Sequence, residues 1–320
     1  MNQRLKDTAT GDVPRAACCV AINASVSRCL LASLILVTRD WLLFLTPGLI
    51  WGASFLFIAE SLRAIGPGGV AFVRICIGFA TLALFPSARQ PIPRESWWPI
   101  AWLGVLWFAF PMSLFPYAEQ RVSSALTGML NGANPLFATL VAAFLARRAP
   151  SRGVAAGLAV GLAGTVLMAL PAMNEGRSSA EGVAMVVVAV MSYGVAINIA
   201  RSLQQRHGAV PVIWRAQAVA IVLTAPLGLS DVVAARWTWT PLLAMLALGA
   251  FGTAIANVAL TAAAGRFGAA RASSTTFLIP VVALVLGVAV RGERVAPVAV
   301  AGGVVCLLGA WLMKRASIAS

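Results

Sequence analysis

Long apolar runs separated by short polar loops follow one another along the chain from residue 41 to residue 313. A helix that crosses the hydrocarbon core of a bilayer needs about 20 apolar residues. Ten runs reach or approach this length, and we expect each to form a membrane-spanning helix. They are 41–62, 68–85, 97–117, 124–145, 154–170, 182–200, 212–229, 241–262, 272–290 and 296–313.

The composition agrees with this pattern, since 60% of the 320 residues are hydrophobic and only 11% are charged. Soluble domains contain about 25% charged residues. The sequence therefore predicts an all-α polytopic membrane protein with ten transmembrane helices. The net charge of +14 would suggest nucleic-acid binding in a soluble protein. Because the basic residues lie between the apolar runs, we expect no nucleic-acid partner.

The basic residues indicate an orientation. With the N-terminus inside, sixteen Lys and Arg lie in cytoplasmic segments and six in outer loops. This asymmetry favours a multi-pass protein of the plasma or inner cell membrane, with both termini cytoplasmic. Residues 1–40 are interpreted as a cytoplasmic tail or an over-extended gene start. The apolar stretch 30–37 leaves a partly inserted eleventh helix as the alternative.

The chain contains an internal repeat. An offset of 141 residues places Arg74 on Arg215, and an offset of 145 places Pro135 on Pro280 and Gly157 on Gly302. Each copy carries five of the expected spans. Because five is odd, the second copy enters the membrane from the opposite side, so the sequence predicts two inverted five-helix repeats. This architecture is typical of secondary transporters.

The repeated segments resemble a known family. Three segments are similar to EamA domains of the drug/metabolite transporter superfamily. Two lie in the first half, WGASFLFIAESL and RVSSALTGMLNGANPLFATLVAAFLARRAPSRGVAAGLAVGLAGTVLM, and one lies in the second half, RFGAARASSTTFLIPVVALVLGVAVRGERVAPVAVAGGVVCLLGAWLM. The resemblance implies repeats at 41–171 and 181–314, and export of small metabolites or drugs. The family's acidic residue after the fourth span of a repeat is present as Glu293, whereas Arg147 and Arg148 replace it in the first half.

Spans four and nine are each interrupted by a proline, which marks a candidate transport site. Pro135 and Pro280 each free a carbonyl four residues earlier, at Asn131 and Thr276. Small polar and aromatic side chains within the spans complete a predicted substrate cavity. These candidates are Trp51, Ser54, Asn134, Tyr193, Asn198, Asn257 and Thr275, and Trp51 and Tyr193 occupy nearly corresponding places in the two repeats. Simple kinks repaired by neighbouring helices are the alternative.

Arg74 lies inside an apolar span, where a charge costs roughly 2.5–3.5 kcal/mol on insertion scales. Its repeat partner Arg215 favours a structural or gating role for both arginines over direct substrate binding. Glu60, near the outer end of the first span, is a possible partner for Arg74 and belongs to the same predicted gating group. Since no acidic residue lies near the centre of a span, the sequence leaves uniport, exchange and coupling through Glu60 open.

These features predict a secondary transporter that exports small organic metabolites, such as amino acids or related compounds, or drugs by alternating access. A membrane-embedded enzyme and a non-transporting scaffold are the alternatives. We expect no enzyme activity, no cofactor and no metal, because the chain has a single histidine, His207, and its five cysteines show no metal-ligand spacing. The expected partners are a small-molecule substrate and the lipid bilayer, and the protein is expected to be a monomer or homodimer.

Overall fold

A computed structural model describes residues 41–267 and 272–319, which are helical with short connections and contain no strand. Within these ranges nine helices are long and apolar enough to cross a membrane, and α2 (Pro67–Ala83) is a shorter apolar helix. The predicted all-helical membrane fold is confirmed. The expectations for residues 1–40 lie outside the described residues.

The first five spans agree with the predicted order, but two of them are composite. They are the helix Trp41–Ser61, α2, the continuous α3 (Trp97–Leu103), η3 (Gly104–Ala109) and α4 (Phe110–Glu119), the pair α5 (Ser124–Asn131) and α6 (Asn134–Ala146), and α7 (Arg152–Asn174).

The second five spans follow the same plan. They are α8 (Arg177–His207), α9 (Ala209–Ala234), the continuous α10 (Trp239–Ala247), η4 (Leu248–Ile255) and α11 (Ala256–Phe267), the pair η5 (Ser273–Phe277) and α13 (Leu278–Arg291), and α14 (Pro297–Ala319). With 31 residues, α8 is longer than the 19-residue run predicted from the sequence, because the polar residues at both of its ends continue the helix.

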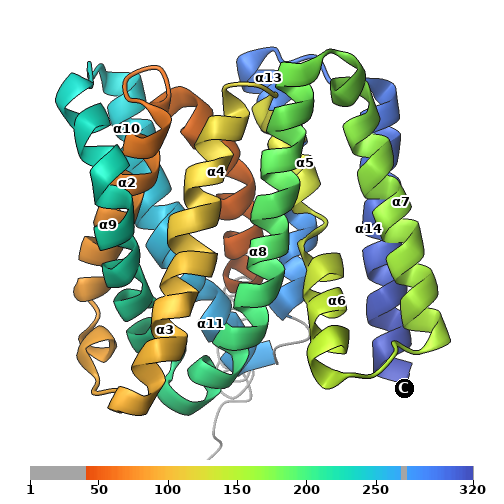
Figure 1. Cartoon of the computed structure of the whole chain (residues 1–320), viewed down its shortest axis with the longest axis horizontal. Helices are drawn as coiled ribbons and strands as arrows, with labels where there is room; N and C mark the ends of the chain where they lie inside the picture. Colours follow the sequence, from red (N-terminus) through yellow and green to blue (C-terminus); the bar gives the residue numbers. More distant parts are fainter. Residues whose placement is uncertain (1–40, 268–271, 320) are drawn as a thin grey trace, which may run out of the picture. The chain divides into compact units, whose positions relative to one another are not determined.

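The residues from Phe44 onward form one compact unit. We call the end drawn at the top of Figure 1 the upper end, where the loops 62–66, 120–123, 175–176, 235–238 and 292–296 lie. The lower end holds the loops 84–96 and 147–151 and the end of α14.

The two repeats pack against each other in equivalent ways. Helix α2 packs on α9 and on η4, and α9 packs on η3. A Cβ added to Gly249 of η4 would lie 2.5 Å from the Cβ of Ile77 in α2, and one added to Gly104 of η3 would lie 2.9 Å from the Cβ of Val219 in α9. In the aligned repeats Gly104 and Gly249 are the same position, so the close approach occurs twice.

Spans three and eight each contain a π-helical segment, η3 and η4, at matching places. A π-helix bonds each N–H to the carbonyl five residues earlier and is frequent at functional sites. In the first copy Pro111 lies two residues after the end of η3, and it has no N–H to donate to the preceding turn. Neither π-segment was predicted from the sequence.

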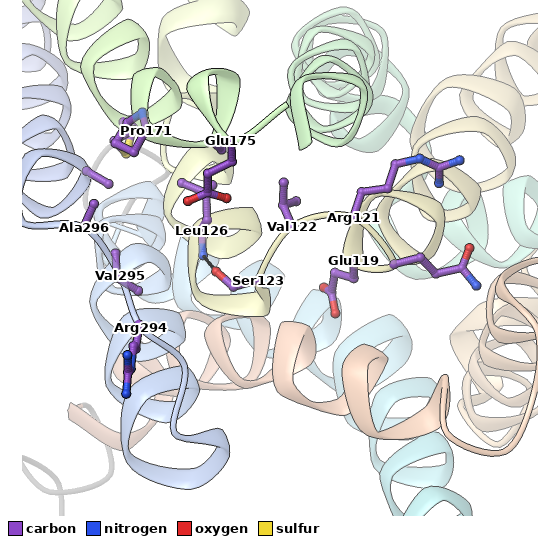
Figure 2. A pocket seen from close by; sticks show the side chains of 14 residues that line it. Glu119, Arg121, Val122, Ser123, Leu126, Pro171, Glu175, Arg294, Val295 and Ala296 are labelled. Carbon is purple, nitrogen blue, oxygen red and sulfur yellow. Dashed lines mark hydrogen bonds between the residues drawn. The ribbon is translucent and has the colours of Figure 1, made fainter. Parts of the chain in front are cut away.

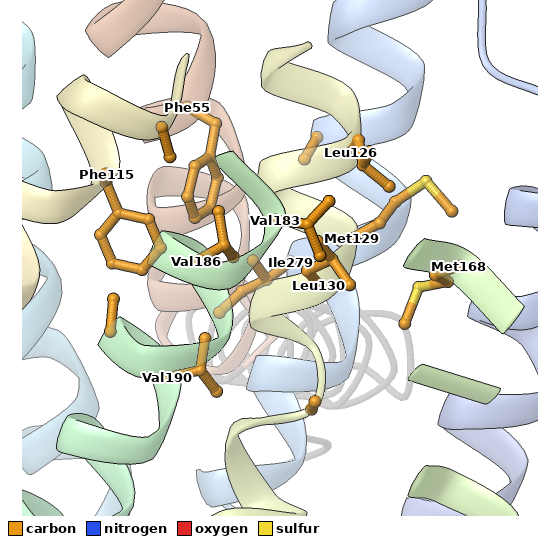
Figure 3. Packing of buried hydrophobic residues seen from close by; sticks show 14 of the residues in the cluster. Phe55, Phe115, Leu126, Met129, Leu130, Met168, Val183, Val186, Val190 and Ile279 are labelled. Atoms are coloured by element: carbon orange, nitrogen blue, oxygen red, sulfur yellow. The ribbon is translucent and has the colours of Figure 1, made fainter. Parts of the chain in front are cut away.

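Helices α7 and α14 pack against each other along glycines. In lipid there is no hydrophobic driving force between helices, so helices associate through close packing, which small residues permit. A Cβ on Gly157 would lie 2.5 Å from the backbone nitrogen of Met313, and one on Gly302 would lie 2.5 Å from that of Met168. The largest apolar core lies beside these helices and includes Phe55, Met129 and Ile279 (Figure 3).

Candidate functional site

Span four is interrupted near its middle. Helix α5 ends at Asn131 and α6 begins at Asn134, while the N–H groups of Gly132 and Ala133 turn back to bond the carbonyls of Met129 and Leu130. Pro135, the second residue of α6, has no N–H with which to continue α5. The interruption predicted from the proline is therefore present.

Span nine is interrupted in a related way. The 3-10 segment η5 gives way to α13 at Leu278, two residues before Pro280. The alignment that places Pro135 on Pro280 places Ala133 on Leu278. Because α6 begins at Asn134 and α13 begins at Leu278, the two helices begin within one aligned position of each other. The two interruptions meet, because a Cβ on Gly132 would lie 2.5 Å from Cγ of Pro280.

The interruption in span four leaves polar groups without partners. The side-chain oxygens Oδ1 of Asn131 and of Asn134 are inaccessible to solvent and accept no hydrogen bond from any residue in the described ranges. Buried polar atoms are nearly always paired in native proteins. Two unpaired amide oxygens at adjoining helix ends therefore indicate a place where a ligand or water binds.

Glu293 caps the upper end of the same broken span. Its Oε1 accepts hydrogen bonds from the backbone N and Oγ of Ser124, at 3.1 and 2.7 Å, and its Oε2 accepts one from the backbone N of Ala125, at 2.8 Å. A carboxylate at a helix N-terminus satisfies free N–H groups and complements the helix dipole. The second repeat thus holds α5 of the first repeat in place.

Two of the predicted cavity residues bind the backbone of the π-segment η4. Nε1 of Trp51 donates to the carbonyl of Gly252 at 3.0 Å, and Nδ2 of Asn257 donates to the carbonyl of Thr253 at 3.1 Å. Ser54, also predicted, is buried and donates to the carbonyl of Ile50 at 2.9 Å. These contacts satisfy carbonyls in and beside the irregular helix and indicate a structural contribution.

In the second repeat Ser192, rather than Tyr193, makes the contact that corresponds to that of Trp51. Its Oγ donates to the carbonyl of Leu106 in η3 at 2.8 Å. Each repeat therefore supplies one side chain, at positions 51 and 192, to the π-segment of the other repeat. The approximate correspondence of Trp51 with Tyr193 expected from the sequence is off by one residue.

The remaining predicted polar residues lie at helix contacts. Nδ2 of Asn198 donates to the carbonyls of Ala138 and Gly194, at 3.0 and 2.8 Å, and so joins α8 to α6. Oγ1 of Thr275 is buried and accepts from the backbone N of Gly48 at 2.9 Å. Thr276 follows it in η5 and is half-buried.

Arg74 is buried, with 5% of its surface exposed, in a polar cluster between α2, η4 and α9. Its Nε donates to Oγ1 of Thr253 at 3.2 Å, and Nε2 of Gln217 donates to the carbonyl of Thr253 at 3.1 Å. Oε1 of Gln217 is buried and unpaired within the described residues. The sequence analysis missed Gln217 and Thr253, although each is a polar residue inside an apolar run.

The two arginines of the repeat have different contacts. Arg215 donates from Nη1 to the carbonyls of Ala88 and Pro211, both at 3.1 Å, and from Nη2 to the carbonyl of Gln90, at 2.7 Å. It therefore ties α9 to the lower-end loop, a structural role.

The pairing of Glu60 with Arg74, suggested by the sequence, does not form. Glu60 lies at the upper end, where its carboxylate pairs with Arg63 at 2.9 Å and with Arg291 at 2.5 Å. The second pair joins the helix Trp41–Ser61 to α13 across the two repeats. Arg291 was not among the predicted residues.

Glu119 is the last residue of α4, at the end of a span rather than near its centre. Both of its carboxylate oxygens are inaccessible to solvent and without a hydrogen-bond partner in the described part of the chain. The charged side chains that interact electrostatically with its carboxylate are Arg74, Arg291 and Glu293. On the same helix Phe115 packs against Phe55, with ring centroids 5.5 Å apart, and against Tyr193, at 5.8 Å.

A pocket of about 320 Å³ at the upper end reaches Glu119 (Figure 2). Figure 2 shows Glu119 and Arg121 on one side of the pocket, Arg294 on the other and Glu175 between them. The described residues contain no group of three His, Cys, Asp or Glu side chains placed to hold a metal ion.

The model of the EamA-like transporter family matches residues 40–170 and 180–315. The chain belongs to the EamA-like transporter family. The two matched segments follow the interlocking halves of the structure and cover most of the chain. The resemblance noted in the sequence is thereby confirmed.

Similar proteins agree with the family. The chain is 25% identical to a probable terminal-alkyne amino-acid exporter of Streptantibioticus cattleyicolor, over 87% of this chain and 94% of the relative. It is 26% identical to the uncharacterized transporter YdfC of Bacillus subtilis, over 81% of this chain and 86% of the relative. A crystal structure of a protein with 20% identity shares the fold, with a TM-score of 0.56 over 86% of this chain and 96% of that one.

Proposed function

We propose that this EamA-like protein is a secondary transporter that exports small organic metabolites, of the class of amino acids and related compounds, or drugs. In this proposal the two repeats, residues 41–171 and 181–314, rock against each other and expose one central site to each side of the membrane in turn. The termini face the cytoplasm, as the excess of basic residues at the lower end favours.

The broken span four carries this proposal. The C-terminal end of α5 and the N-terminal end of α6 adjoin, beside the unpaired amide oxygens of Asn131 and Asn134. Irregular backbone at membrane depth is tolerated where it is buried in protein or lines a water-filled cavity, and interrupted helices form the binding sites of many transporters. The site is therefore expected to bind the polar part of an organic solute.

The comparisons support the same class of function. The relatives are named as transporters, which points away from an enzyme, and one of them is named as a probable amino-acid exporter. Amino acids and related compounds are therefore the first substrates to test.

The test is flux into or out of proteoliposomes that contain the purified protein and a panel of amino acids and cationic drugs. We expect Asn131→Ala and Asn134→Ala to lower flux of the substrate roughly three- to tenfold, the cost of one net hydrogen bond. Thermal stability should change little, because the removed oxygens have no partner.

Asn198→Ala is the matched control. It removes hydrogen bonds to two carbonyls and should lower the melting temperature more than either of the other substitutions. Absence of flux of every panel compound through the wild-type protein, or full flux through both Asn131→Ala and Asn134→Ala, would contradict the proposed function.

A further inference from the structure

Two buried groups of opposite charge lie near each other without pairing. Arg74 lies in α2 and Glu119 at the end of α4, two helices that pack against each other, yet no ion pair joins the two side chains. The only hydrogen bond that the Arg74 guanidinium makes to the described residues is from Nε to Thr253. Both oxygens of Glu119 lack a partner in the same part of the chain. Unpaired charges out of water are costly, so each group has the capacity to bind a complementary charge.

The neighbouring charges do not fill this role. Arg291, which acts on Glu119 from α13, is bound to the carboxylates of Glu60 and Glu293. Glu293 in turn accepts three hydrogen bonds at the start of α5. Of these charged side chains, Arg74 and Glu119 are therefore the two that make few or no hydrogen bonds to the described residues.

The repeat shows that the fold does not require an acid at the position of Glu119. In the register that aligns the two halves, Phe108 takes the place of Thr253 and Ala264 takes the place of Glu119. Phe108 is fully buried in an apolar cluster, so this position packs well without a polar group. Arg215, the equivalent of Arg74, donates its hydrogen bonds to loop carbonyls. The charged pair is thus specific to the first repeat.

The surroundings suit a small organic ligand. Phe115 lies one turn from Glu119 on α4 and packs against Tyr193 of α8, with ring centroids 5.8 Å apart. Glu119 also contributes to the lining of the pocket at the upper end. Aromatic walls with a few convergent polar groups are typical of small-molecule sites.

We propose that Arg74 and Glu119 form a subsite for a zwitterion, and that this subsite selects α-amino acids or similar compounds. The guanidinium of Arg74 binds the ligand's carboxylate, for which its paired donors have matching geometry. The carboxylate of Glu119 binds the ligand's ammonium group. The ligand thereby supplies a partner of opposite charge for each of the two side chains. This inference rests on the proposed function and adds to it the class of substrate.

The experiment measures binding separately from transport. The purified protein is screened against the twenty common amino acids by thermal stabilisation and by tryptophan fluorescence. The best binder is then compared with its primary amide, which lacks the carboxylate, and with its des-amino acid, which lacks the ammonium. The wild-type protein should bind the zwitterion about tenfold or more tightly than either analogue.

The variants assign each charge. Arg74→Gln should remove the preference for the zwitterion over the amide, and Arg74→Lys should retain part of it. Glu119→Gln should remove the preference over the des-amino acid. Arg215→Gln and Glu95→Gln are the matched controls, because Arg215 binds loop carbonyls and Glu95 is exposed in the lower-end loop, away from the pocket. Both controls should keep the selectivity of the wild-type protein.

Several results would overturn the inference. These are equal binding of all three compounds by the wild-type protein, binding of no amino acid, and unchanged selectivity in folded Arg74→Gln and Glu119→Gln proteins. Selective binding without flux in proteoliposomes would support the subsite while contradicting the proposed transport.

Discussion

At the scale of single residues, Glu293 is the acid that the family resemblance singled out, and the structure gives it a physical role. Its carboxylate accepts three hydrogen bonds at the N-terminus of α5 and pairs with Arg291. Glu293→Gln keeps the size of the side chain but removes the charge and one acceptor oxygen. We expect a loss of about 1–2 kcal/mol in the free energy of unfolding.

The measurement is thermal unfolding in detergent, where this loss corresponds to a fall of a few degrees in the melting temperature. Glu175→Gln is the control, because Glu175 is exposed and should leave the melting temperature unchanged. Equal melting temperatures for both variants would show that the cap contributes no stability. The partner Ser124 lies 169 residues away in the chain, so a single sequence cannot reveal the contact.

At the scale of helices, the packing of α7 on α14 depends on glycines that face backbone. A Cβ on Gly309 would overlap the backbone nitrogen of Gly161, and neither helix can shift locally to make room. We expect Gly309→Ala to cost about 1–3 kcal/mol of stability through overpacking. Gly303→Ala, on the same helix, is the control, since its Cβ would meet the flexible ends of two methionines, Cε of Met129 at 2.9 Å and Sδ of Met168 at 3.6 Å.

Detergent melting curves of the two variants test this expectation. Gly309→Ala should melt well below the wild-type protein, and Gly303→Ala should melt close to it. If the two variants melt together, the helices are not held at the separation seen here.

The helices also show which features a sequence can predict. The spans follow from runs of apolar residues, and the interruptions follow from Pro135 and Pro280, because proline acts locally on its own helix. The π-segments η3 and η4 were missed, since side chains from other spans, such as Trp51 and Ser192, satisfy their carbonyls. Likewise, Glu119 reads as a boundary residue until the neighbouring helices bury its carboxylate.

At the scale of the whole molecule, the proposed orientation makes a prediction about which loops face each side of the membrane. Gln90 is exposed at the lower end and Ser178 is exposed at the upper end, and the structure shows no side-chain hydrogen bond for either residue. In a cysteine-free background we expect Ser178→Cys to react with a membrane-impermeant maleimide on intact cells. Gln90→Cys should react only in inside-out vesicles, because sixteen basic residues against six favour a cytoplasmic lower end.

The labelling pattern separates two errors. Reversed labelling would mean that the basic residues do not orient the protein, while leaving the repeats and their packing intact. Labelling of both cysteines from the same side would contradict an odd number of spans between positions 90 and 178, and with it the inverted repeat. Permeabilised cells, in which both cysteines should react, control for access to each thiol. In an inverted arrangement one central site meets two ends built from equivalent parts, which is one architecture that supports alternating access.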